Sequence, residues 1–122
     1  MKYADLLEEA LLQLPKFKKQ YEEDLLAGNI DADDGMHIVF CEVFMPVLHD
    51  LIDEKDSVSV NNFFSFVEKM ENSGDPLVAE VAEFTVLEDL CDNYNDKDFL
   101  GYLGENTKDA LKQIRKYIPE SA

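Results

Sequence analysis

A long apolar segment, MHIVFCEVFMPVLHDLID, occupies residues 36–53 of the chain. Its apolar residues recur at three- and four-residue spacings around much of a helix circumference, which predicts a buried central helix. Pro46 interrupts the segment. Because proline has no backbone N–H, it should kink this helix or divide it in two, with a hydrogen bond lost near Glu42. A helix that is apolar on several sides needs neighbours to cover it, so the flanking segments should be helical too.

The residues before this segment show the same helical spacing. A first helix is expected from about Tyr3 to Leu14, and a second piece from Phe17 to Leu26. Pro15 stands between them and either kinks one helix or starts the second. A glycine and an acidic loop, residues 28–35, then separate these helices from the central one.

The residues after the central segment predict four more helices, at about residues 60–70, 76–91, 97–103 and 106–118. Ser59 is expected to cap the first of them, and Asp75 the second, with Pro76 at its first position. The last helix should present Tyr117 and Ile118 and end at Pro119. The expected apolar face of the helix at 76–91 comprises Leu77, Val78, Val81, Phe84, Leu87, Leu90 and Cys91. The chain is thus predicted to be a single all-α domain, residues 1–122, built as a compact bundle or a short solenoid-like array of six to eight helices.

The charge of the chain is large and uneven. Its 122 residues include 27 acidic and 11 basic side chains, for a formal net charge of −16. Residues 21–60 carry −10 and residues 61–104 carry −8, whereas residues 1–20 and 105–122 carry +1 each. Nucleic acids and anionic membrane surfaces repel such a chain, so neither is expected as a direct partner. Self-repulsion of this size costs stability, and it favours a basic protein as the partner.

The cysteines and the N-terminal residues indicate in which cellular compartment the protein is expected. Cys41 and Cys91 are the only cysteines, and both fall in apolar helical stretches. They are expected to be buried, reduced thiols, with one disulfide between them as the alternative. Met1–Asp5 lacks the apolar core of a signal peptide, and no run approaches the length of a membrane span. The expected location is the cytoplasm.

Residues 31–35, DADDG, are a first candidate for a bound ion. An EF-hand frame from Asp31 places Asp33 at the third position and Glu42 at the twelfth. The glycine that an EF-hand requires at the sixth position stands instead at the fifth, as Gly35. An acidic loop that leads into the next helix explains this run without calcium.

The two histidines give no recognised catalytic or metal-binding spacing. His37 lies four residues before Cys41, and His49 shares a helix face with Glu42 and with Asp53. Neither pattern is HExxH or ExxH, and the chain has no GxSxG, P-loop or GxGxxG motif. No catalytic residue, metal or cofactor is therefore expected, and the chain is not predicted to be an enzyme.

Acidic residues share faces of the helix expected at residues 76–91. Glu80 and Glu83 lie together, and Glu88 and Asp92 form a second pair with Asp89 beside them. Like charges at these spacings weaken an isolated helix by a few tenths of a kcal/mol per pair. Such faces are either solvated surface or a docking surface for lysines and arginines of a partner. Together with the charge of the whole chain, they favour a docking surface.

Two stretches, FFSFVEKM (residues 63–70) and VAEVAEFTVLEDL (residues 78–90), resemble a pattern in bacterial proteins encoded near toxin genes. The pattern, a Phe-rich helix followed by one that ends in Leu-Glu-x-Leu, is similar to the helical immunity proteins of contact-dependent growth inhibition systems. The similarity covers roughly residues 36–118. In such families the toxin is often a basic nuclease, and the immunity protein commonly covers its RNA-binding cleft with acidic side chains.

The function predicted from the sequence is therefore that of an immunity protein, which binds and neutralises a cognate basic toxin, first of all an RNase. The alternatives are a helical adaptor or regulatory protein, or a nucleic-acid mimic, with another basic partner; a small metal-dependent enzyme ranks below both. Acidic residues are expected to supply most of the contacts and a few aromatic ones the buried anchors. The predicted partner-binding residues are Glu80, Glu83, Glu88, Asp89, Asp92, Asp31, Asp33, Asp34, Tyr94, Phe99 and Tyr102.

Overall fold

The computed structural model describes residues 1–116, and within them the chain forms helices and loops without any strand. Residues 36–53 and residues 76–93 each run on as one helix across a π-helical interruption, so this part of the chain has seven helices and the predicted all-α class is confirmed. Tyr117, Ile118 and Pro119 lie outside the described residues. The elements are η1 (Tyr3–Asp5), α1 (Leu6–Gln13), α2 (Pro15–Ala27), α3 (Met36–Val39), η2 (Phe40–Phe44), α4 (Met45–Asp53), α5 (Ser57–Glu71), α6 (Pro76–Val81), η3 (Ala82–Leu87), α7 (Glu88–Asn93), α8 (Asp96–Phe99), η4 (Leu100–Tyr102) and α9 (Glu105–Arg115).

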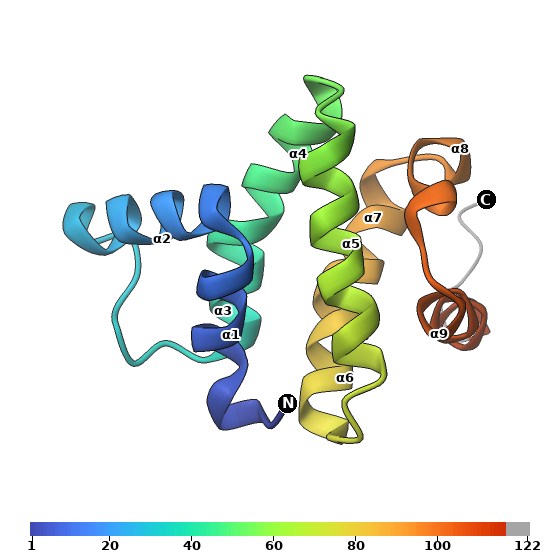
Figure 1. Cartoon of the computed structure of the whole chain (residues 1–122), viewed down its shortest axis with the longest axis horizontal. Coiled ribbons are helices and arrows are strands. Elements are labelled where there is room, and N and C mark those ends of the chain that lie inside the picture. The colour runs from blue at the N-terminus through green and yellow to red at the C-terminus, as the bar shows by residue number, and fades with distance from the viewer. Residues whose placement is uncertain (117–122) are drawn as a thin grey trace.

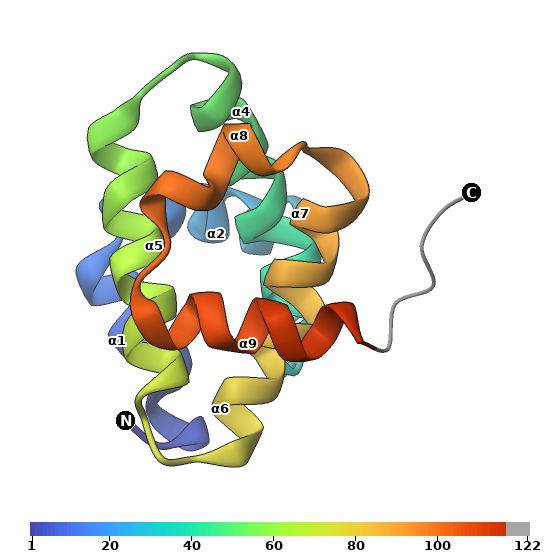
Figure 2. The ribbon, with the colours of Figure 1, turned by 90° about the vertical axis from the view of Figure 1, so that its right-hand side faces the viewer.

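Helix α5 has α1 and α2 on one side and α9 on the other (Figure 1). In the view turned by 90°, α9 crosses in front of the other helices (Figure 2). The continuous helices α3–η2–α4 and α6–η3–α7 run side by side behind α5. Aromatic rings fill the space between α2, η2 and α5: the ring of Phe17 stacks on Phe63 at 5.0 Å and meets the edge of Phe44 at 5.6 Å. The central position predicted for residues 36–53 is confirmed, because this helix touches α2, α5 and η3.

The helix of residues 36–53 continues across Pro46 and is not divided there. The turn just before the proline, η2, is a π-helix, in which the N–H of Met45 bonds to the carbonyl of Phe40 five residues back. A wider turn places the proline where its missing N–H and its ring are tolerated, as π-bulges do elsewhere. Of the two outcomes expected at Pro46, a kink or a division, the division is therefore wrong, and the helix has a locally wider turn just before the proline.

A second π-helical segment, η3, lies inside the helix of residues 76–93 and was not predicted. The N–H of Glu88 bonds to the carbonyl of Glu83, again five residues back. Regular 3.6-residue spacing had placed Leu77 and Phe84 on the buried face. That prediction was wrong, because their exposed fractions are 53% and 55%. The buried residues of this helix are Val78, Val81, Ala82, Val86, Leu87 and Leu90.

The ends of three helices show how side chains fix the arrangement. Asp75 caps α6 as predicted, and its carboxylate accepts a hydrogen bond from the N–H of Leu77. Helix α5 is capped by Asp56, which accepts from the N–H of Ser59, so the predicted role of Ser59 itself is corrected. Helix α9 receives its cap from another helix, through the carboxylate of Glu68 in α5. None of the helices within residues 1–116 combines the length and the apolar character needed to cross a bilayer.

Candidate functional site: an acidic groove between two interrupted helices

A groove of about 460 Å³ opens between the two continuous helices behind α5. One wall comes from α3, η2 and the start of α4, and the other from η3 and α7. Both π-helical segments therefore border the groove, and segments of this kind are frequent at functional sites. We call it the acidic groove. Its lining residues are His37, Ile38, Cys41, Glu42, Met45, Phe84, Thr85, Glu88, Asp89, Asp92 and Asn93.

Two histidines of the helix that forms the first wall, His37 in the groove and His49 beyond it, reach across to the helix that forms the second. His37 Nδ1 lies 2.7 Å from Thr85 Oγ1, and His49 Nε2 lies 2.6 Å from Asp89 Oδ1. The rings of Tyr94 and His49 pack edge to face with their centroids 5.3 Å apart, and the Tyr94 hydroxyl donates to the His49 carbonyl at 3.5 Å. These contacts fix the position of one helix relative to the other, so the fold itself determines the shape of the groove.

Carboxylates dominate the electrostatics of the groove. Glu42, Glu88, Asp89 and Asp92 line it, and no Lys or Arg of residues 1–116 does. The negative charge continues beyond the groove around Tyr94. Burial raises the pKa of the Tyr94 hydroxyl, and Asp53, Asp89, Asp50 and Asp98 raise it further by their charge. A cation at this face would meet carboxylates from two helices at once.

Apolar side chains lie beside these acids. Phe84 and Ile38, one on each wall, have exposed fractions of 55% and 47%. Large apolar residues that stand exposed next to a hollow mark binding surfaces more often than scattered single ones do. The groove therefore offers apolar contact area as well as negative charge.

Cys41 also opens into the groove, which corrects the expectation that both cysteines are buried. Its side chain is exposed, while Cys91 is half-buried, and both are free thiols. Partial burial raises the pKa of the Cys41 thiol, and the charges of Glu42 and Asp89 add to this effect. The group is thereby held as a thiol, which is the weaker nucleophile.

The structure brings together three of the predicted acids, Glu88, Asp89 and Asp92, and it sets Tyr94 beside them. Asp89 is partly engaged by His49. Glu80 stands exposed on α6, and Glu83 is half-buried; neither lines the groove.

Two aromatic residues that were predicted to contact a partner, Phe99 and Tyr102, pack against the core instead. Phe99 is fully buried in the core, so its prediction as a partner-binding residue is corrected: no part of its ring reaches the surface. Tyr102 is half-buried and stacks on the ring of Phe64 at 5.8 Å.

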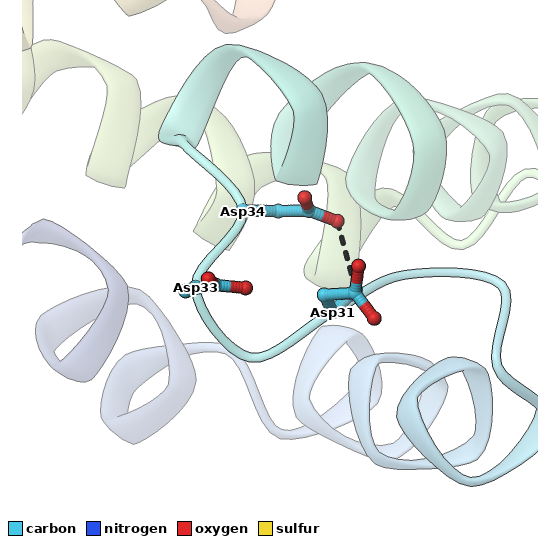
Figure 3. A group of neighbouring side chains, drawn as sticks. All are labelled: Asp31, Asp33 and Asp34. Atoms are coloured by element: carbon cyan, nitrogen blue, oxygen red, sulfur yellow. Dashed lines mark hydrogen bonds between the residues drawn. The ribbon is translucent and has the colours of Figure 1, made fainter.

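The acids of the loop before α3 form a separate cluster (Figure 3). One carboxylate oxygen from each of Asp31, Asp33 and Asp34 lies within 4.8 Å of the others. The N–H of Asp31 donates to Asp34 Oδ2 at 2.8 Å, and this bond shapes the turn. Met36, at the position where an EF-hand needs glycine, is buried as the first residue of α3. None of the three acids lines the acidic groove.

A family model described as "Domain of unknown function (DUF7674)" matches residues 7–119. The chain belongs to the DUF7674 family. No curated protein and no solved structure matches it. The matched range contains both walls of the acidic groove, so the groove is part of the DUF7674 domain itself.

Sequence reasoning missed several residues of this DUF7674 domain that form the groove. Helical spacing predicts a buried Phe84 and a buried helix over residues 36–53, which include Ile38, and the only functional role that it offers for Glu42 is that of a metal ligand. For the first wall the sequence contains a signal, because Pro46 indicates an irregular helical turn just before the proline. For the second wall we find no local signal, because η3 contains neither proline nor glycine.

Proposed function

We propose that this protein is an immunity protein that binds a cognate basic toxin, first of all an RNase, through its acidic groove. One observation carries the proposal: four carboxylates line a groove with exposed Phe84 and Ile38, and no Lys or Arg among residues 1–116 neutralises them there. The likeness of residues 63–70 and 78–90 to helical immunity proteins supports the same function.

The toxin would be neutralised in two ways: its basic residues would pair with the acids of the groove, and its RNA-binding cleft would be covered. An enzyme that cleaves RNA holds its substrate with Lys and Arg side chains, and these would pair with Glu88, Asp92 and Glu42. The bound protein then covers the cleft and excludes RNA. Opposite charges speed the encounter of the two proteins and disfavour partners of the wrong charge. Most of the affinity would come from a few apolar anchors, for which Phe84 and Ile38 are placed.

The test uses the protein encoded by the gene beside that of this protein, purified, assayed for toxic RNase activity and mixed with matched variants. Glu88→Gln with Asp92→Asn removes two charges inside the groove, and Asp31→Asn with Asp33→Asn removes two charges outside it. We expect the groove variant to lose at least tenfold in association rate and in inhibition of the toxin, while the loop variant stays within about twofold of the wild type. The wild-type association rate should fall steeply between 50 and 500 mM NaCl, as screening predicts.

Two results would overturn the proposal. One is equal inhibition of the toxin by the wild type and by the groove variant, because the acids would then have no specific role. The other is a combined result in which the neighbouring gene encodes no toxin and the protein binds a basic partner of another kind. That outcome would favour an adaptor or regulatory protein.

A further inference from the structure

The chemistry of the acidic groove changes from one end to the other. Its two wall helices, α3–η2–α4 and α6–η3–α7, run side by side in the same direction, from the lower to the upper part of Figure 1. Ile38 and Phe84 lie near the start of the two linings, and both are apolar and about half exposed. A contact of His37 with Thr85 joins the walls beside them. This part of the groove, which we call the apolar end, offers contact area for an apolar side chain.

The acids of the groove follow beyond the apolar end. In the second wall Glu88 comes one turn after Phe84 and Asp92 one turn later, about 6 Å and about 12 Å along the helix axis. In the first wall Glu42 comes one turn after Ile38. Within the described part of the chain, neither Lys nor Arg lines the groove. An occupant that matches the groove therefore presents an apolar group first, and positive charges about one and two turns further along.

The backbone of the occupant must also be satisfied. An extended segment needs partners for its N–H and C=O groups, which the edge of a sheet supplies. The described part of this chain contains no strand, and both walls of the groove are helices. A helix pairs its own backbone groups and lays the side chains of one face into a groove of this kind. Residues three and four positions apart share such a face, which is also the spacing of the acids in the wall.

We propose that the acidic groove binds a helix of its partner in which an apolar residue at position i shares one face with basic residues at i+4 and i+7, counted in either chain direction. The apolar side chain enters the apolar end between Ile38 and Phe84. The nearer basic side chain pairs with Glu42 and Glu88, and the further one pairs with Asp92. This inference rests on the proposed function, because it names the segment of the basic partner that the groove holds.

The probe is a synthetic peptide of 16 residues, built mostly of alanine and glutamine, with both ends blocked. It carries leucine at its fifth position and arginine at its ninth and twelfth, so the three side chains share one face of a helix. A second peptide has the same sequence written backwards, which keeps the order of the groups and reverses the helix direction. In the control peptide the arginines move to the seventh and tenth positions, on the opposite face, without any change in composition or charge.

Amide chemical shifts of the protein report binding as each peptide is added up to about 1 mM in 50 mM NaCl. We expect at least one of the two directions to perturb the groove lining, and the control peptide to bind at least fivefold more weakly. Glu88→Gln with Asp92→Asn should weaken the tighter peptide at least tenfold. Asp31→Asn with Asp33→Asn, outside the groove, should leave it within about twofold. Equal binding of the control peptide, perturbations confined to other surfaces, or no binding in either direction would overturn the proposal.

Double-mutant cycles test the order of the contacts. Once the leucine of the peptide is replaced by alanine, Phe84→Ala should cause little further loss of affinity, while Asp92→Asn should still weaken binding severalfold. Once the further arginine is replaced by glutamine, the reverse is expected. Coupling of the leucine to Asp92 in place of Phe84 would refute the proposed order.

The peptide experiment and the test of the proposed function can fail separately. The peptides require no toxin, so binding in the expected order would support the proposed helix even if the neighbouring gene encodes a protein of another kind. A toxin that is inhibited through Glu88 and Asp92, while neither peptide binds the groove, would refute the helix and leave the immunity function in place.

Discussion

Glu71 is a residue whose protonation the fold controls. One of its carboxylate oxygens is buried and, within residues 1–116, has no hydrogen-bond partner. Burial is the largest influence on this group, followed by a hydrogen bond with Glu83 and by the charges of Glu83 and Glu68. Together they raise the pKa of Glu71 to about 9. At neutral pH the side chain is therefore protonated, and its O–H can donate to the Glu83 carboxylate.

This shift predicts how stability depends on pH. Between about pH 5 and pH 9 the folded state keeps the Glu71 proton and the unfolded state has lost it, so the free energy of unfolding should fall as pH rises. Glu71→Gln keeps a donor for Glu83 without a titrating group, and it should flatten this decline. Because the site is only partly buried, we expect a gain of about 1–2 kcal/mol at pH 8. Urea unfolding at pH 5, 7 and 9 measures the slope, with the exposed Glu80→Gln as control. Parallel slopes for all three proteins would contradict the assignment.

Phe84 differs from the other phenylalanines because half of its surface is free. Phe84→Ala should lower the free energy of unfolding by less than about 1 kcal/mol, since little apolar area returns to water. Phe63→Ala, at a fully buried position, should cost about 3–5 kcal/mol. Chemical denaturation of the two variants measures both values. A large loss at Phe84 would mean that the ring supports the core and is not free to bind a partner.

At the scale of elements, one carboxylate of α5 caps α9, which also packs on the core through its buried residues. Glu68 accepts hydrogen bonds from the N–H and the hydroxyl of Thr107 at 2.8 and 2.7 Å, and from the N–H and side-chain amide of Asn106 at 3.1 Å each. A cap supplied by another helix fixes where α9 begins and where it lies. Gly104 precedes this helix, and a Cβ there would collide with the Glu68 carboxyl group.

The close approach at Gly104 predicts a cost for any side chain. Gly104→Ala should lower the free energy of unfolding by about 1–3 kcal/mol, because the carboxylate must move away from the N–H groups that it caps. Gly101→Ala is the matched control, since apart from its chain neighbours no atom of residues 1–116 lies within 4 Å of a Cβ at that position, and its effect should stay within about 0.5 kcal/mol. Thermal unfolding of both variants compares them directly. Equal stability of the two would show that Glu68 adapts without loss.

At the scale of the whole molecule, only part of the negative charge is concentrated in the acidic groove. The groove collects Glu42, Glu88, Asp89 and Asp92, but other acids have other roles. Asp56 pairs with Lys16, and its pKa falls to about 2, chiefly through that hydrogen bond. Asp96 pairs with Arg115, which ties α8 to α9. Lys16–Asp56 and Arg115–Asp96 each pair opposite charges, and such pairing leaves the formal net charge of −16, counted with neutral histidines, unchanged.

This imbalance predicts that salt stabilises the fold. Raising NaCl from 10 to 300 mM shortens the range of the repulsion among the acids from about 30 Å to less than 10 Å, so the midpoint of thermal unfolding should rise by several degrees. The reference is a variant with four exposed acids neutralised away from the groove: Glu22→Gln, Glu23→Gln, Asp31→Asn and Asp33→Asn. The midpoint of thermal unfolding of this variant should be higher than that of the wild type in low salt and should rise less when salt is added. A midpoint that falls with salt in both proteins would mean that the ion pairs outweigh the repulsion.

The sequence by itself determined the helical class, most helix ends and the acidic excess. These follow from local rules: three- and four-residue spacing marks an apolar face, and Asp75-Pro76 or Gly28 marks an end within a few residues. It also placed Glu88, Asp89 and Asp92 near one another, because they share two turns of one helix.

Only the tertiary structure decided where those acids lie and what lies beside them. Two π-helical turns changed which side chains face outward, and the packing of residues 36–53 against residues 76–93 set Ile38 and Glu42 opposite Phe84 and Asp92. The cap of α9 by Glu68, and the cross-wall bond from His49 to Asp89, likewise join residues about 40 positions apart. Helix periodicity carries no information about such pairs, since they form only when buried surfaces pack and bring distant segments together.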